Sequence, residues 1–247
     1  MGLSTDRILG RVLELARPVL PGAGAHLDIG AGTGALIGLI RGAHPGVRCR
    51  ACDYTDSLMQ LDDQSVDIAN LDADPLPYPA DSFDLVTCTE VIEHLENFRR
   101  LVRETFRVTK PGGAVIFSTP NILNLRSRLR FLFFGFWNLF GPLPVGRAET
   151  YSTLGHISPV SYFYLAHALS ESGFVLDRLT TDKWQRTAVA PLLVLWPLIA
   201  PLGAMARRRE SRRHHRIDDS NRAIVESMNR VKMLLGRTII VLARKPV

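Results

Sequence analysis

Cysteine is scarce in this sequence of 247 residues, which contains three. Cys49, Cys52 and Cys88 are too few for a disulfide framework and too poorly spaced for a four-ligand zinc site. This usage is typical of a protein from a reducing compartment. Residues 1–7 also show no basic region followed by an apolar run, and Asp6 stands where a myristoylation signal needs serine or threonine. These absences predict a cytoplasmic location.

Internal repeats are absent too, and neither charge dominates. Hydrophobic residues make up 46% of the chain and charged residues 22%, which excludes a disordered or fibrous polymer. We therefore expect one domain over residues 1–247 with a full apolar core. The 30 Lys and Arg exceed the 24 Asp and Glu by a formal charge of +6, which leaves nucleic acid or anionic lipid open as an acidic partner.

Strand and helix patterns alternate along the chain. Apolar runs predict seven strands, at residues 25–30, 47–53, 66–71, 83–89, 114–119, 173–180 and 237–244. Apolar residues at helical spacing predict helices over residues 8–20, 35–41 and 97–109. This order indicates an α/β fold with a doubly wound, mostly parallel seven-stranded sheet and helices on both faces. Ligands of such sheets bind at the carboxyl ends of the strands.

A glycine-rich loop, Asp28-Ile-Gly30-Ala-Gly32-Thr-Gly34, joins the first strand to a helix. Glycines in this context let a ligand lie against the backbone near the helix N-terminus. The loop also fits a dinucleotide fingerprint, and a plain strand-to-helix turn is the simplest alternative. The Asp28 carboxylate favours a ligand with an amino group or sulfonium, because it would repel a pyrophosphate. Asp53, 19 positions beyond Gly34, suits ribose hydroxyls in either case.

The loop is one of several motifs that together resemble class I S-adenosylmethionine-dependent methyltransferases over residues 20–120. The others are Asp53, Asp72-Ala-Asp-Pro-Leu-Pro-Tyr78, Ser82-Phe-Asp-Leu-Val86 and Pro111-Gly-Gly113. The resemblance implies S-adenosylmethionine as cofactor, bound by Asp28, by Gly30, Gly32 and Gly34 at its methionine moiety, by Asp53 at its ribose, and by Asp72 and the Ala73 backbone at its adenine.

The segment Glu90-Val-Ile-Glu-His94 follows the fourth strand, where we expect a helix to begin. On a helix, Glu90, Glu93 and His94 would share one face and could hold a divalent cation, which would lower the pKa of a bound hydroxyl. Alternatively, Glu90 contacts the cofactor while His94, helped by Glu93, acts as a general base. The simplest alternative is that Glu93 and His94 only cap and solvate the helix.

This segment resembles the one in ubiquinone-biosynthesis O-methyltransferases, of the type 11 methyltransferase group, and in terminal 2′-O-methyltransferases of small RNAs. Those families imply a site for Mg²⁺ or another divalent cation, with a further ligand after the fifth strand. Ser118-Thr-Pro-Asn121 matches their motif at that point, and His156 is the implied distal ligand beside Glu90, Glu93 and His94.

Two segments interrupt the alternation, and we expect both to be insertions near the ligand edge. Residues 121–160 contain an aromatic run, Phe131 to Phe140, and predict a lid over the substrate. Residues 184–236 contain 20 uncharged residues, Thr187 to Ala206, followed by six arginines within residues 207–216. Twenty helical residues span about 30 Å, enough for a bilayer, but three prolines argue against a transmembrane helix, because each removes a backbone donor: Pro191, Pro197 and Pro201.

We therefore expect this second segment to insert shallowly in an anionic membrane surface, which places the protein peripherally on the inner face of the membrane. The two insertions could instead pack on each other as a lid or a dimer face. The sequence does not predict an oligomeric state.

The resulting hypothesis is O-methylation of a hydroxyl on a small amphipathic or lipid-linked acceptor, such as an isoprenoid phenol or a glycolipid sugar. A second hypothesis is terminal 2′-O-methylation of RNA. Aromatic residues are not interleaved with the arginines as a stacking platform requires, which argues against nucleic acid. A third hypothesis is a membrane-associated protein that binds S-adenosylmethionine without catalysis, and a dinucleotide oxidoreductase is a more distant fourth.

Overall fold

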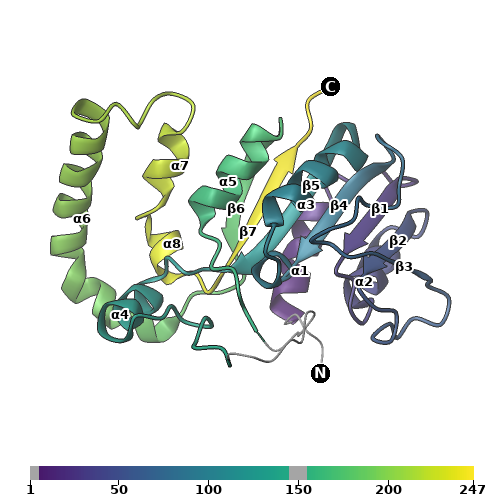
Figure 1. The fold of residues 1–247 in the computed structure, drawn as a ribbon, viewed down its shortest axis with the longest axis horizontal. Coiled ribbons are helices and arrows are strands. Elements are labelled where there is room, and N and C mark those ends of the chain that lie inside the picture. The colour runs from purple at the N-terminus through teal and green to yellow at the C-terminus, as the bar shows by residue number, and fades with distance from the viewer. Residues whose placement is uncertain (1–5, 145–154) are drawn as a thin grey trace.

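A seven-stranded sheet forms the centre of the protein (Figure 1), in a computed structural model that describes residues 6–144 and 155–247. The strand order is β3-β2-β1-β4-β5-β7-β6, and only β7 runs antiparallel to its neighbours. The strands are β1 (Ala25–Ile29), β2 (Arg48–Asp53), β3 (Val66–Ile68), β4 (Phe83–Thr89), β5 (Thr109–Pro120), β6 (Val175–Thr181) and β7 (Thr238–Arg244). The predicted fold class is confirmed.

Helices cover both faces of the sheet, because successive strand residues are apolar and point in opposite directions. Leu85 and Ile116 pack with α1 (Asp6–Ala16) and α2 (Ala35–Ala43). Their chain neighbours Val86 and Phe117 lie in a second cluster on the other face. That cluster includes residues of α3 (Phe98–Val108), α5 (Tyr162–Glu171) and α7 (Arg222–Ser227).

Two elements end three or more residues before the point that their sequence patterns predict. Helix α1 ends at Ala16 rather than at residue 20, because Pro18 has no backbone N–H and disfavours helical backbone at Arg17. Strand β3 ends at Ile68 rather than at residue 71, because residues 70–74 form a turn. In that turn the Asp74 backbone N–H donates to the Asn70 carbonyl at 2.7 Å.

The predicted insertions contain mainly helices, although residues 145–154 of the first lie outside the described part of the chain. The first contributes α4 (Leu125–Phe134). The second contributes η2 (Arg186–Ala188), α6 (Val189–Arg212), α7 and α8 (Val231–Leu235). Figure 1 shows α4 and α6 to the left of the sheet, on the side of β6 and β7.

Helix α6 is continuous over 24 residues and accommodates all three of its prolines. Pro191 lies in the first turn, where a backbone N–H has no partner within the helix. Pro197 and Pro201 lie inside the helix, where each removes one hydrogen bond. The two prolines are one turn apart and exposed, so water can bind the carbonyls that they leave without a donor.

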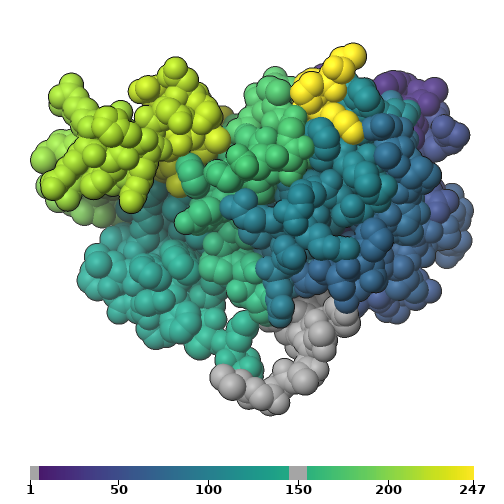
Figure 2. Space-filling view, turned by 45° about the horizontal axis from the view of Figure 1, so that its top comes forward, coloured from purple at the N-terminus to yellow at the C-terminus, as the bar shows by residue number. Residues whose placement is uncertain are grey.

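Most of α6 extends away from the core. Its start packs against α4 and α8 through a small cluster that contains Leu192, its only buried residue. The space-filling view shows the segment around the end of α6 and α7 as a yellow-green lobe at the upper left (Figure 2). Among the described residues, the helix over Arg186–Arg212 is the only one long and apolar enough to cross a membrane.

Candidate functional site

The glycine-rich loop follows β1 and has backbone conformations that require glycine. Gly30, Gly32 and Gly34 have φ angles of 69°, 51° and 78°, in the left-handed region that other residues rarely adopt. A Cβ atom on Gly30 would lie 2.1 Å from Val91 Cγ2, and one on Gly34 would lie 2.6 Å from Met59 Sδ. The loop is therefore closely packed at the carboxyl end of β1.

Asp28 is buried below this loop, and a short chain of hydrogen bonds holds its side chain. Thr87 Oγ1 donates to Asp28 Oδ1 at 2.7 Å. Because that hydroxyl proton is used, Thr87 Oγ1 accepts from His26 Nε2 at 2.8 Å. Burial lowers the pKa of His26 to about 3 and raises the pKa of Asp28 to about 7. Asp28 is thus a desolvated carboxyl group that a cationic ligand would favour in its ionised form.

His26 and Thr87 are not among the site residues that the sequence predicts. Their signal in the sequence is weak, because neither residue belongs to a recognisable motif within its strand. Parallel pairing of β1 with β4 places Thr87 opposite Asp28. The strand order is needed to see this pairing.

Asp53, at the end of β2, lies against the glycine-rich loop. Its Oδ2 accepts from the Gly32 backbone N–H at 2.8 Å, and its Oδ1 accepts from that of Tyr54 at 2.7 Å. Burial raises the pKa of Asp53 above its ordinary value. Asp53 therefore positions the loop, and its role at a ribose stays a prediction.

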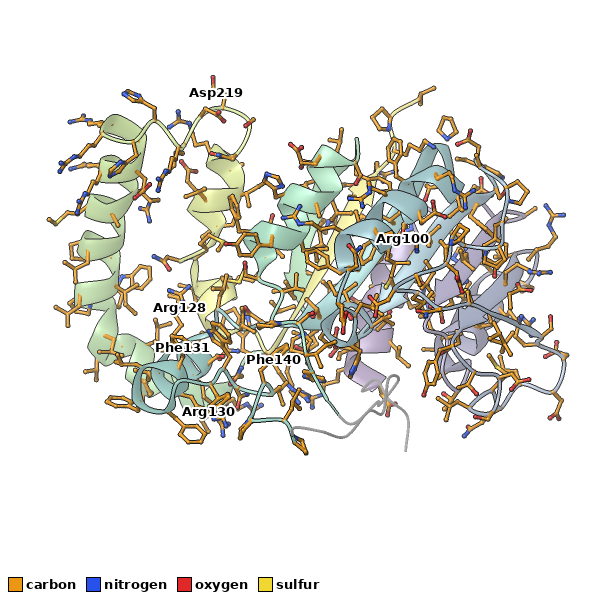
Figure 3. The ribbon with its side chains drawn as sticks, viewed as in Figure 1. Arg100, Arg128, Arg130, Phe131, Phe140 and Asp219 are labelled. Atoms are coloured by element: carbon orange, nitrogen blue, oxygen red, sulfur yellow. The ribbon has the colours of Figure 1, made fainter. Side chains whose placement is uncertain are left out.

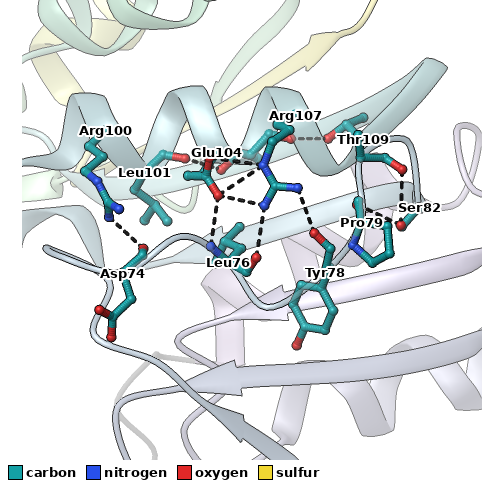
Figure 4. A network of polar contacts seen from close by, with 12 residues as sticks. Asp74, Leu76, Tyr78, Pro79, Ser82, Arg100, Leu101, Glu104, Arg107 and Thr109 are labelled. Atoms are coloured by element: carbon teal, nitrogen blue, oxygen red, sulfur yellow. Dashed lines mark hydrogen bonds and ion pairs between the residues drawn. The ribbon is translucent and has the colours of Figure 1, made fainter.

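Asp72 and Ala73 lie in the turn after β3, and neighbouring contacts fix that turn to α3. Asp72 Oδ1 accepts from the Asn97 backbone N–H at 2.8 Å. Figure 4 shows the adjoining segment held by side chains of α3. The hydrogen bonds join Arg100 to the Asp74 carbonyl, Glu104 to the Leu76 N–H, and Arg107 to the carbonyls of Leu76 and Tyr78. The predicted adenine-binding segment is thus held in place by the protein itself, and its contact with adenine stays a prediction.

Glu90 precedes η1 (Ile92–His94), which replaces the helix expected to begin at this point. The reason is the Glu90 backbone, whose φ of 56° is in the left-handed region and turns the chain. Glu90 Oε1 accepts from Ser118 Oγ at 2.8 Å. Burial raises the pKa of Glu90 to about 7, and the positive charge of Arg237 opposes that rise.

Glu93, His94 and His156 meet after this turn, although His156 is distant in the sequence. One side-chain ligand atom of each lies within 4.8 Å of the others. The two imidazole rings contact edge to face, with centroids 4.9 Å apart. The Glu93 carbonyl accepts from the backbone N–H groups of Ile157 and Ser158, and this docks the segment that carries His156. Glu90, the fourth predicted metal ligand, lies outside this group.

The donor atoms of this cluster are suited to a cation. Glu93 is fully buried, and its Oε2 accepts from Thr119 Oγ1 at 3.1 Å, while its Oε1 has no partner among the described residues. His156 Nδ1 is buried and equally unpartnered within the described ranges. His94 Nδ1 donates to the Gly155 carbonyl at 2.9 Å, which leaves a lone pair on Nε2. One carboxylate and two imidazoles form a ligand set that Zn²⁺, Mn²⁺ and Fe²⁺ accept in proteins.

Burial favours the uncharged form of each member of the cluster. Burial raises the pKa of Glu93 well above its ordinary value, and the nearby charge of Glu90 adds to that rise. Burial lowers the pKa of His156 to about 4 and also lowers that of His94. Both imidazoles are therefore neutral at pH 7 and can accept a proton or bind a cation.

Comparisons with known proteins agree with the motifs. Residues 27–117 match the model of a family described as methyltransferase domain. Demethylmenaquinone methyltransferase of Corynebacterium efficiens is 32% identical over 126 residues, which are 49% of this chain and 54% of that protein. Malonyl-[acyl-carrier protein] O-methyltransferase of Methylococcus capsulatus is 32% identical over 99 residues, 38% of this chain and 36% of that protein. The chain thus matches about half or less of the length of these relatives.

The fold is also found in solved structures. A SAM-dependent methyltransferase from Archaeoglobus fulgidus superposes with a TM-score of 0.59 at 19% identity, over 96% of this chain and 94% of that one. A methyltransferase structure from Bacillus halodurans gives a TM-score of 0.58 at 15% identity, over 97% and 99% of the two chains. At these identities the likeness shows the fold.

Proposed function

We propose, for a chain whose residues 27–117 carry a methyltransferase domain on the class I methyltransferase fold, that it transfers a methyl group from S-adenosylmethionine to a hydroxyl of a small amphipathic acceptor. One observation supports this most directly. Glu93 and His94, which cluster with His156, closely follow Val91, whose side chain packs against Gly30 of the glycine-rich loop. A proton acceptor therefore lies next to the predicted methyl donor site.

In the proposed reaction, the acceptor oxygen attacks the methyl carbon in line with the breaking bond to sulfur. The oxygen–carbon bond forms, the sulfonium becomes a thioether, and the hydroxyl proton goes to His94 Nε2. The Gly155 carbonyl orients the imidazole for this transfer by accepting from Nδ1. The protein's main contribution is to hold donor and acceptor in one geometry.

The same cluster also fits a divalent cation, which we propose as the alternative role of Glu93, His94 and His156. Such a cation would lower the pKa of a bound acceptor hydroxyl. In that case His94 is a ligand and not a base. Assays after dialysis against EDTA, with Mg²⁺, Mn²⁺ or Zn²⁺ added back, distinguish the two roles. Activity that is indifferent to chelation and to added cation removes the metal proposal and leaves His94 as the base.

Transfer to carbon is a second candidate reaction, because the demethylmenaquinone methyltransferases among the relatives are named for a quinone. A prenylated phenol and a prenylated naphthoquinol, each in mixed micelles, serve as probe acceptors with S-adenosylmethionine labelled at the methyl carbon. The carbon NMR spectrum of the product separates a methoxy group from a ring methyl group. A methoxy product supports our proposal, and a ring methyl product overturns it in favour of carbon.

Binding of S-adenosylmethionine tests the cofactor site apart from the acceptor. Calorimetry on the wild-type protein and on Asp28→Asn is the measurement. We expect binding by the wild type and a loss of about tenfold or more in the variant, because the buried carboxylate is replaced by an uncharged amide. Absence of binding by the wild type would refute the methyltransferase proposal. Binding without transfer to any probe would favour the non-catalytic alternative.

We also propose that α6 and α4 attach the protein to an anionic membrane surface. Val194, Leu198, Leu202 and Met205 recur at helical spacing along α6 and are all exposed, Val194 at 75%. Arg209 and Arg212 continue the same stripe at the end of the helix. Apolar side chains that lead to a basic end complement the acyl region and the anionic headgroups of a bilayer.

Helix α4 adds aromatic side chains near the start of α6. Phe131, Leu132, Phe133 and Phe134 are exposed, Phe133 at 82%. Figure 3 shows Phe131 and Arg130 at the lower left of the molecule, away from the sheet. Arg128 fixes α4 to the segment before α8 by donating to Asn229 Oδ1 and to the Met228 carbonyl, both at 2.7 Å.

Flotation with vesicles tests this surface. We expect the wild type to float with vesicles that contain phosphatidylglycerol, and Leu198→Gln/Leu202→Gln to lose most of that binding. The matched control is Ile68→Gln/Val175→Gln, which removes equally exposed apolar residues from the sheet. Equal loss in both double variants, or no flotation of the wild type, would contradict the membrane proposal.

A further inference from the structure

A pocket of about 470 Å³ opens near the carboxyl edge of the sheet, next to the end of β6. Four of its described lining residues are uncharged and five are basic, and none of them is acidic. The lining residues are Arg7, Arg126, Asn138, Lys183, Trp184, Gln185, Arg186, Thr187 and Arg237.

The five basic side chains of this pocket are not neutralised by close ion pairs within the described protein. In the ranges 6–144 and 155–247, none of them forms an ion pair, whereas arginines and lysines elsewhere pair with Asp63, Asp67, Asp84 and Glu104. Five cations around one pocket repel each other, and a bound anion would relieve that repulsion. The pocket therefore has the charge of an anion site.

Four different parts of the chain place these residues together. Arg7 is in the first turn of α1, Arg126 is in that of α4, and Lys183 and Arg186 lie in the segment from β6 to α6. Arg237 directly precedes β7. Because β7 is antiparallel, its start lies at the same edge of the sheet as the ends of β4 and β5. The pocket is thus on the edge that carries the predicted methyl-transfer site.

Backbone contacts fix the wall of the pocket and join it to that site. The Arg237 N–H donates to the Lys183 carbonyl at 3.1 Å, and Trp184 forms an isolated bridge with Gly236. The Arg237 carbonyl accepts from the Asn121 N–H at 2.9 Å, at the end of β5. The positive charge of Arg237 also acts on the Glu90 carboxyl group.

We propose that this basic pocket binds a phosphate or diphosphate group of the acceptor, so that the substrate class is a phosphorylated amphiphile. The inference rests on the proposed methyl transfer, because it assigns the anion to that reaction's acceptor. Several guanidinium groups and an ammonium suit the multiple oxygens and charges of a diphosphate better than a single carboxylate. A phosphate held here would orient an acceptor whose hydroxyl extends toward His94.

Calorimetry with inorganic diphosphate on the full chain tests the pocket without a known acceptor. We expect the wild type to bind diphosphate and Lys183→Gln/Arg186→Gln to bind it at least about tenfold more weakly, because two charge-assisted contacts are lost. The control Arg48→Gln/Arg103→Gln removes two exposed charges from outside the pocket and should bind like the wild type. No binding by the wild type, or equal weakening in both double variants, overturns the proposal.

Tryptophan fluorescence gives a second measurement at the pocket itself. We expect diphosphate to change the emission of the wild type and this change to disappear in Trp184→Phe, while calorimetric binding persists. Trp137 and Trp196 lie outside the pocket lining and report on other regions. A fluorescence change that survives in Trp184→Phe places the anion elsewhere and overturns the assignment.

A phosphate could also come from a membrane headgroup, and flotation separates the two sources. Our proposal predicts that saturating diphosphate leaves the protein on phosphatidylglycerol vesicles and that Lys183→Gln/Arg186→Gln still floats. Release by diphosphate, or failure of that variant to float, would assign the pocket to the lipid and overturn the acceptor role. S-adenosylmethionine binding is measured on the same samples, and its absence would refute the proposed methyl transfer independently of the pocket.

Discussion

Asp28 has a carboxyl group whose ionisation depends on its surroundings. Burial at the end of β1 raises its pKa to about 7, and the charge of Asp53 adds to the rise while the Thr87 hydroxyl opposes it. His26, the other titratable neighbour in the chain of hydrogen bonds, is neutral at this pH because burial holds its pKa at about 3. A cationic amino group placed near Asp28 would therefore stabilise the charged form of this carboxyl group.

The affinity for S-adenosylmethionine should depend on pH through Asp28. Below pH 7 the carboxyl group is protonated in the free protein, and above pH 7 it is ionised. We expect the Kd for S-adenosylmethionine to fall as the pH rises through about 7, approaching a tenfold change for each pH unit on the acidic side. Calorimetry over a pH series measures this. The change of Kd with pH should be much smaller in Asp28→Asn. An equal pH dependence in both proteins would contradict the role of Asp28.

Thr87 should tune this dependence, because its hydroxyl donates to the Asp28 carboxylate. Thr87→Val removes the donor and should raise the pKa of Asp28 further, so that the pH profile of binding moves to higher pH and affinity at pH 7 falls severalfold. Thr89→Val is the control on the same strand, since the Thr89 hydroxyl is buried and has no partner among the described residues. We expect that control to keep the wild-type profile. Identical profiles for Thr87→Val and the wild type would show that the contact does not affect Asp28.

Helix α6 shows how exposure changes the effect of proline. Pro197 and Pro201 lie inside a continuous helix whose middle has little contact with the core. The sequence shows which donors proline removes, but it does not show that water can bind the freed carbonyls. A buried helix with the same prolines would lose more stability, because water could not bind the carbonyls that the prolines leave without a donor.

Replacing one proline should therefore stabilise α6 locally. Pro197→Ala restores a backbone donor and removes a ring that clashes with the preceding turn, worth up to about 3 kcal/mol in a helix interior. We expect slower hydrogen exchange in residues 198–205 and little change in the Tm of the domain, because α6 packs on the core mainly at its start. Pro191→Ala, in the first turn, should have a much smaller effect. Equal exchange in both variants and the wild type would contradict this account.

The strands and the glycine-rich loop are predictable because their signals are local. An apolar run, a glycine pattern and an acidic residue at a strand end can each be recognised over a few residues, and β1, β4 and β7 lie where the sequence places them. The turn at Glu90 is not predictable, because a left-handed residue other than glycine leaves no pattern. His156 is identified by resemblance alone, since its contact with His94 depends on the docking of a distant segment.

At the scale of the whole molecule, the formal charge of +6 is unevenly placed. The six arginines of residues 207–216 and Glu210 account for +5 of it. The five basic residues of the pocket lie at the sheet edge instead, near Glu90, on which the charge of Arg237 acts. Position therefore decides what each group of arginines can bind.

Location of charge, and not its total, should govern binding to membranes. Arg209→Gln/Arg212→Gln and the control Arg48→Gln/Arg103→Gln have the same net charge. We expect the first to bind phosphatidylglycerol vesicles roughly 30-fold more weakly, at about 1 kcal/mol for each arginine, and the control to bind like the wild type. Flotation at several salt concentrations measures this. Equal weakening in both would mean that net charge alone attracts the protein to the vesicle.

The reversed direction of β7 also affects how this protein can diversify. The chain leaves the sheet after β6 and returns at Arg237, whose N–H binds the Lys183 carbonyl, so the long excursion between them starts and finishes at one point. The entropic cost of bringing the two ends of such a loop together grows only with the logarithm of its length. The segment between Lys183 and Arg237 can therefore change in length or sequence without altering the strands that carry the glycine-rich loop. Grafting this segment onto another sheet with the same strand order should transfer the exposed apolar and basic surface of α6 together with it.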